Sequence, residues 1–195
     1  MKQKLIARSL AAFAATLMAA PAMAHLDPAA HGSVAAGFTH PLFGADHVLA
    51  MVAVGLWAAM LGGRAVWTVP AAFVGAMAAG FALSLLGMSL PLIEPLILAS
   101  VIVMGVLVAL AVKLPMAAGT AVVATLALFH GQAHGTEMGG AGALAYLGGF
   151  ASATALLHVA GIVLGLGLAR VSQTLALRAM GGAVAALGAW LAVAG

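Results

Sequence analysis

Residues 66–87 read VWTVPAAFVGAMAAGFALSLLG, a run that contains no ionisable side chain. An α-helix needs about 20 predominantly apolar residues to cross the hydrocarbon core of a bilayer. The run is long enough for one crossing, and the whole chain is 65% hydrophobic and only 6% charged. A soluble core could not bury this much apolar surface. The sequence therefore predicts an all-α membrane protein.

Further apolar segments lie on both sides of this run. They are separated by Gly, Pro and single charges, and together they predict six transmembrane helices. The chain has no cysteine, which excludes disulfides, thiolate metal sites and a cysteine nucleophile. The predicted spans are 42–62, 66–87, 91–112, 115–134, 141–168 and 175–194.

The first 24 residues have the features of a cleaved signal peptide. Lys2, Lys4 and Arg8 form a basic segment, residues 9–20 are apolar, and Ala22-Met23-Ala24 is a small-x-small cleavage site. The alternative is an uncleaved anchor, but the apolar part is short for a span of about 20 residues. Residues 25–195 are then the six-helix domain. Cleavage leaves four basic and four acidic residues. The mature chain then has no excess of positive charge, and nucleic-acid binding is not expected.

The basic residues of the mature chain predict its orientation. All four fall in the loops at 62–66, 112–115 and 169–178, which the positive-inside rule places in the cytoplasm. A cleaved signal peptide gives the same result, with both mature termini exoplasmic. We expect the protein in the bacterial cytoplasmic (inner) membrane, in contact with lipid. The four residues are Arg64, Lys113, Arg170 and Arg178.

Two short runs, HPLFGADH at 40–47 and HGQAHGTE at 130–137, hold four of the seven histidines and two of the four acids. Ionisable groups at membrane depth usually mark a pathway, a relay or a ligand site. Imidazoles beside carboxylates also suit a borderline divalent metal. The predicted topology places both runs at the exoplasmic ends of their spans. The pattern indicates metal or proton chemistry at this side of the membrane.

Helical spacing predicts how each run presents its side chains. At about 100° per residue, His130, His134 and Glu137 share one face of a helix. In the first run Pro41 suits the first helical position, which leaves His40 at the cap. His47 then lies near the face of His40.

Asp46 points about 120° away from this face. It is therefore expected to fix the tautomer of an imidazole from another helix rather than to bind an ion directly.

Other polar residues are weaker candidates for the pathway. His158 lies midway along the fifth span, Glu94 lies near the outer end of the third, and His25 and His31 lie in the mature N-terminal segment. The alternative for His158 is a buried hydrogen-bonding role, and His25 and His31 can simply be solvated.

Small residues spaced by four predict close helix packing. The pairs are Gly131 with Gly135, Gly135 with Gly139, and Gly161 with Gly165. Around the second run, such an approach could bring the histidines of the first span to a shared ion.

The His-Pro-x-x-Gly-x-Asp-His run at 40–47 and the Phe-His-Gly-x-Ala-His-Gly-x-Glu run at 129–137 resemble the HupE/UreJ family. The resemblance implies uptake of nickel or cobalt, and a functional link to hydrogenase, urease or cobalamin synthesis. It implies a secondary permease rather than an enzyme, with the ion as substrate and no prosthetic group. Ni²⁺ is the first candidate, Co²⁺ the second, and Zn²⁺ is less expected. The functional residues that it implies are His40, Asp46, His47, His130, His134 and Glu137.

Two other classes use similar residues. An intramembrane zinc hydrolase binds Zn²⁺ through three protein ligands and keeps a position for water. A b-type haem protein would pair histidines from two helices. ATP hydrolysis by this chain is excluded because it contains no nucleotide-binding loop.

Overall fold

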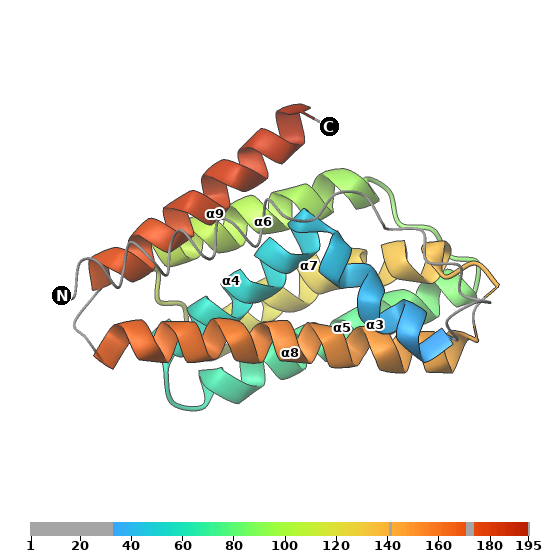
Figure 1. Cartoon of the computed structure of the whole chain (residues 1–195), viewed down its shortest axis with the longest axis horizontal. Coiled ribbons are helices and arrows are strands. Elements are labelled where there is room, and N and C mark those ends of the chain that lie inside the picture. Colours follow the sequence, from blue (N-terminus) through green and yellow to red (C-terminus); the bar gives the residue numbers. More distant parts are fainter. Residues whose placement is uncertain (1–32, 141, 171–173, 195) are drawn as a thin grey trace.

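The computed structural model describes residues 33–140, 142–170 and 174–194. All regular structure in these ranges is helical, which confirms the predicted all-α class (Figure 1). The predicted signal peptide at 1–24 lies outside the described residues, as do His25 and His31. The helices are α3 (Ser33–Phe43), α4 (Ala45–Leu61), α5 (Ala65–Leu85), α6 (Ile93–Ala109), α7 (Met116–Glu137), α8 (Ala143–Arg170) and α9 (Thr174–Ala194).

Four of these helices, α5, α7, α8 and α9, are long and apolar enough to cross a membrane. The pair α3 and α4 meets the same criteria only together, with an 84° bend between the two helices. Helix α6 has 17 residues, so it is about 26 Å long and close to the lower limit for a crossing. The structure thus gives four crossing helices, or five with the bent pair, and six spans stay a prediction.

The first predicted span is interrupted. The sequence predicts one helix over 42–62 that begins near Pro41, but α3 continues through Pro41 to Phe43 and α4 begins at Ala45. Pro41 has no N–H for a helical hydrogen bond, which weakens its turn, and the helix ends two residues later. His40 therefore lies on a different helix from His47. The prediction that these two histidines share one helix face is wrong.

Gly44 lies at the bend, where an added side chain would crowd its neighbours. It adopts an extended conformation between the two helices. A Cβ at this position would lie 2.9 Å from Asp46 Oδ1 and 3.0 Å from His47 Nδ1. Asp46 stabilises the new helix start, since its carboxylate accepts a hydrogen bond from the His47 N–H at 2.8 Å near the positive end of the helix dipole.

Helices α5 and α7 pack closely through glycine. Gly131 lies directly against the backbone at Met77, and Gly135 lies against the α5 backbone and a serine side chain. This confirms the close approach predicted at these two glycines, although the neighbour is α5 rather than the helix of the first run. The predicted pair Gly135 with Gly139 is wrong. Gly139 follows the end of α7 in a turn with φ 57°, and a Cβ added to it would meet none of the described residues within 4 Å.

Helix α4 is the central helix of the bundle. Eleven of its 17 residues are buried, and it packs against α5, α6 and α8. Gly55 and Gly161 bring α4 and α8 into backbone contact, as the small residues of α8 predict. At its C-terminal end, Trp57 Nε1 donates a hydrogen bond to the Val112 carbonyl at 2.9 Å. These contacts hold α4 inside the protein, and His47 is buried on the same helix.

Helix α8 runs along the length of the bundle, and α3 lies against it at one end (Figure 1). Among the described residues, the acidic and the basic side chains lie at opposite ends of the bundle. Asp46 begins α4, Glu94 begins α6 and Glu137 ends α7, all at the end where α3 lies. The basic side chains lie at the opposite end: Arg64 and Lys113 in the connections after α4 and α6, and Arg178, whose Nε donates to the Ala109 carbonyl at 2.8 Å.

Candidate metal centre

Four histidine rings meet where α3, α4 and α7 converge. We call His40, His47, His130 and His134 the histidine cluster. The ring centroids are 4.8 Å apart for His40 and His134, and 4.5 Å apart for His47 and His134. His47 and His130 follow at 4.8 Å. The structure thus brings the two sequence runs together, with His134 at the centre.

The outer part of the cluster includes a carboxylate. His40 Nε2 lies 2.9 Å from Glu137 Oε2, and His134 Nδ1 lies 3.6 Å from the same oxygen. The three residues each offer one ligand atom, and these atoms lie within 4.8 Å of one another. Glu137 is exposed, His40 is partly exposed and His134 is buried. The group therefore leads from the protein surface to the buried centre of the cluster.

Asp46 determines which nitrogen of His47 is free. The carboxylate only accepts hydrogen bonds, so the neutral imidazole donates its Nδ1–H to Asp46 Oδ1 at 2.9 Å. The lone pair then resides on Nε2, which is buried and has no hydrogen-bond partner among the described residues. Asp46 thus orients an imidazole, as predicted. That imidazole is the next residue of the same helix rather than a histidine of another helix, because the Asp46 carboxylate folds back over the first turn of α4 and bonds to both the backbone N–H and the ring of His47.

Ser100 of α6 has the same effect on His130. Its hydroxyl donates to the Ile97 carbonyl at 2.6 Å, so its oxygen accepts a hydrogen bond from His130 Nε2–H at 2.9 Å. The lone pair of the neutral ring is then on Nδ1, which is buried without a partner in the described ranges. Second residues that fix imidazole tautomers in this way are typical of metal-binding histidines.

His134 is fully buried, and neither of its ring nitrogens has a hydrogen-bond partner in the described structure. Its ring packs on Phe150 with a centroid distance of 3.8 Å. A buried polar group left unpaired costs about 1–3 kcal/mol. Three neighbouring imidazoles, His47, His130 and His134, each carry such a group. This donor set fits a divalent transition metal, which binds neutral imidazole nitrogen.

The remaining candidates lie apart from the cluster. Glu94 is exposed, and it lines a shallow pocket with Asp46 between the ends of α4, α6 and α9. His158 of α8 is buried and contacts the Phe73 ring instead of another histidine, with centroids 5.0 Å apart.

Several residues of the centre escaped the sequence reasoning. Ser100 is the one hydroxyl residue of α6, which is apolar apart from Glu94 at its start, and this signal could have drawn attention to it. Tyr146, the only tyrosine of the chain, lies beside His40 with centroids 6.1 Å apart. Phe73 and Phe150 line the cluster, but aromatic residues in apolar helices give no signal of their own.

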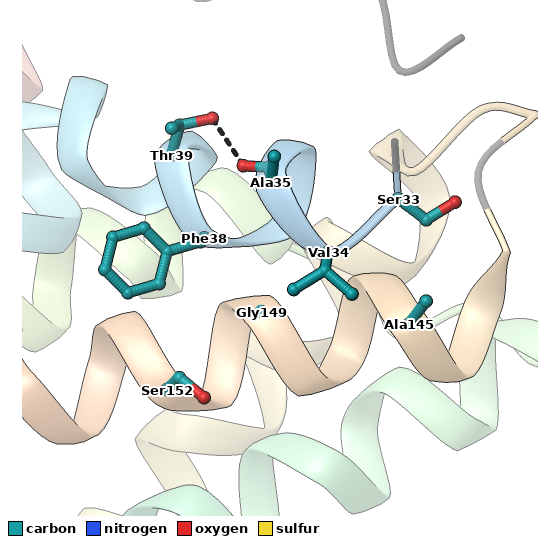
Figure 2. Close-up of a pocket in the computed structure, with 8 residues that line it drawn as sticks. All are labelled: Ser33, Val34, Ala35, Phe38, Thr39, Ala145, Gly149 and Ser152. Atoms are coloured by element: carbon teal, nitrogen blue, oxygen red, sulfur yellow. Dashed lines mark hydrogen bonds between the residues drawn. The ribbon is translucent and has the colours of Figure 1, made fainter. Parts of the chain in front are cut away.

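A separate groove lies on the surface of the bundle between α3 and α8. Figure 2 shows Val34 and Phe38 of α3 facing Gly149 and Ser152 of α8 across it. Among the described residues, no ionisable side chain lines this groove. It therefore lacks the donors that a metal requires, and it is no alternative to the histidine cluster.

Fold and site together define a multi-pass helical membrane protein with a buried group of histidines at one end of its bundle. The chain belongs to the HupE/UreJ family, because the family model described as HupE / UreJ protein matches residues 13–191. It is 46% identical over 196 residues to Protein HupE of Rhizobium leguminosarum bv. viciae. The alignment covers 99% of this chain and 100% of the relative. No solved structure matches the chain.

The family consists of accessory proteins of hydrogenase and urease that are associated with nickel and cobalt transport. The resemblance found in the two histidine runs is thereby confirmed. Neither the family nor the relative supports the zinc hydrolase or the b-type haem protein.

Proposed function

We propose that the protein is a secondary permease that carries Ni²⁺, or alternatively Co²⁺, across the bacterial cytoplasmic membrane. The observation that carries this proposal is the set of buried, unpartnered imidazole nitrogens on His47, His130 and His134. Their lone pairs are available to an ion. In this proposal the protein is not an enzyme and has no prosthetic group. Its functional link to hydrogenase, urease or cobalamin synthesis is the supply of the metal.

The donor set suits transport because it can also release the ion. Neutral imidazole and carboxylate bind borderline divalent metals without the very strong retention of thiolates. The chain offers no thiolate at all. We propose that His40 and Glu137 capture the ion together with His134, and that His134 then passes it to His47 and His130. His134 belongs to both groups, so the transfer needs only a small displacement.

The acidic end of the bundle supports an outer entrance. Asp46 and Glu94 line one pocket there, and Glu137 is exposed nearby. Clustered carboxylates raise the local concentration of cations at such a surface. With the acids outside and Arg64, Lys113 and Arg178 inside, the structure is compatible with the positive-inside rule. The proposed topology has a cleaved signal peptide and exoplasmic termini. Its six spans count the bent pair α3 and α4 as one and the short α6 as another.

Reconstitution into sealed proteoliposomes tests this function. The wild type should take up Ni²⁺ or Co²⁺ faster than empty vesicles, and His134→Ala should abolish the difference. Thr125→Ala is a matched control, because Thr125 is exposed on the same helix and bonds only to its own backbone. It should transport like the wild type. Equal uptake by His134→Ala and the wild type, with both proteins folded, would overturn the proposal.

A further inference from the structure

His158 lies in the core without the contacts that normally justify a buried histidine. Its side chain is 1% exposed, and neither ring nitrogen has a hydrogen-bond partner within the described residues. An imidazole loses its hydration on burial, and this loss is ordinarily compensated by hydrogen bonds. A side chain kept for packing alone would be more stable here as an apolar residue. The position therefore requires a reason that involves the nitrogen atoms.

The depth of His158 separates it from the histidine cluster. Its backbone carbonyl contacts Gly55 of α4. Gly55 follows His47 by eight residues, which corresponds to about 12 Å along the helix. His158 thus lies roughly halfway between the acidic end, where the histidine cluster is, and the basic end of α4.

The Phe73 ring contacts both His158 and the cluster. Its centroid is 5.5 Å from that of His130 and 5.0 Å from that of His158. The cluster histidines are in ring contact with one another, whereas His158 has no ring contact with any of them. His158 is therefore separate from the cluster, and Phe73 is the residue that contacts both.

The surroundings of His158 contain two further donor atoms. Thr154 lies one turn earlier on α8 and so on the same face. Its hydroxyl is 3.6 Å from the Met77 sulfur, and both residues are buried. Hydroxyl and thioether groups are weak ligands, and only imidazole would hold a borderline metal firmly. Such a site suits brief occupancy.

We propose that His158 is an inner metal site, where Ni²⁺ or Co²⁺ binds after it leaves the histidine cluster and before it reaches the basic end of the bundle. This inference rests on the transport function proposed above. The ion exchanges one imidazole nitrogen for another, with water completing its coordination. The second site divides a long apolar crossing into two shorter steps, which lowers the energy of the ion between the ends of the pathway.

The variant His158→Leu separates an inner site from a packing role. Leucine has a similar size and suits an apolar core, so the protein should stay folded with an unchanged or higher unfolding temperature. Ni²⁺ binding at the outer cluster, measured by calorimetry in detergent, should stay within about twofold of the wild type, because this residue contacts none of the cluster ligands. Initial Ni²⁺ uptake into proteoliposomes should fall at least about tenfold, because the ion loses its intermediate site.

Thr154→Val is the matched control, since it removes a buried polar group one turn away but leaves the imidazole. Its uptake should stay within about threefold of the wild type, as Thr154 is only an auxiliary donor. If His158→Leu does not fold, His158→Gln keeps a polar side chain with a much weaker metal ligand and should show the same loss.

Normal uptake by a folded His158 variant would overturn the inner site alone. Absence of uptake by the wild type would instead overturn the transport function, and the inner site with it.

Discussion

The two histidine runs reach the same centre by different structural means. The run at 130–137 lies on one continuous helix, α7, and its ligands are fixed by helical spacing and by the close contact of Gly131 with α5. The run at 40–47 is broken at Gly44, and its histidines come from two helices related by an 84° bend. A continuous helix presents ligands one above another, whereas a bend can direct them from two sides. The placement of the second run's ligands therefore depends on helix packing, whereas the placement of the first run's ligands depends on the local backbone geometry at Gly44.

The largest effect should follow from a side chain added to the second run. In Gly131→Ala the new methyl group meets the backbone of Met77, which no rotamer change can relieve. We expect a loss of about 2–3 kcal/mol in unfolding free energy, seen as a lower unfolding temperature in detergent. Gly148→Ala is the control, because Gly148 is a glycine of α8 with nothing within 4 Å. If both variants are equally stable, close packing does not position the second run.

Asp46→Asn tests the first run next. The change keeps the shape of the side chain but removes the charge that holds the His47 Nδ1–H, so Nε2 is no longer fixed as the ligand atom. Ni²⁺ affinity should fall about 10- to 100-fold in calorimetry. Glu94→Gln removes a carboxylate of the same pocket that has no hydrogen bond to a described histidine, so its affinity should fall far less than that of Asp46→Asn. A wild-type affinity for Asp46→Asn would contradict the orienting role.

Gly44→Ala should have a smaller effect than Gly131→Ala, and it should change the metal affinity rather than the stability of the fold. The added methyl group meets only the side chains of Asp46 and His47, which can shift, so the fold should persist. Their displacement should lower Ni²⁺ affinity about fivefold. Gly75→Ala, on α5 with open space around it, provides the comparison. A large loss of stability in Gly44→Ala would remove the distinction between the two runs.

The same contrast explains what the sequence could predict. Apolar length and helical spacing were sufficient for the all-α class and for the shared face of His130, His134 and Glu137, because these depend on one helix at a time. The bend at Gly44 was missed, since the hydrophobic character of 42–62 continues across it. Ser100 and Phe73 were missed because their roles arise only when α6 and α5 pack against α7. The partner of Asp46 was assigned to the wrong helix because helical spacing puts adjacent residues about 100° apart, whereas the carboxylate reaches the ring of the next residue.

In the proposed centre, the two runs hold one ion. A double-mutant cycle on His47→Ala and His134→Ala tests it, with Ni²⁺ affinity measured by calorimetry and folding checked for each protein. The two rings lie 4.5 Å apart between centroids, so the second substitution should cost little once the first has destroyed the site. We expect the double variant to be less impaired than the sum of the single losses by more than about 1 kcal/mol. Losses that add to within about 0.3–0.5 kcal/mol would show two independent sites and contradict the shared centre.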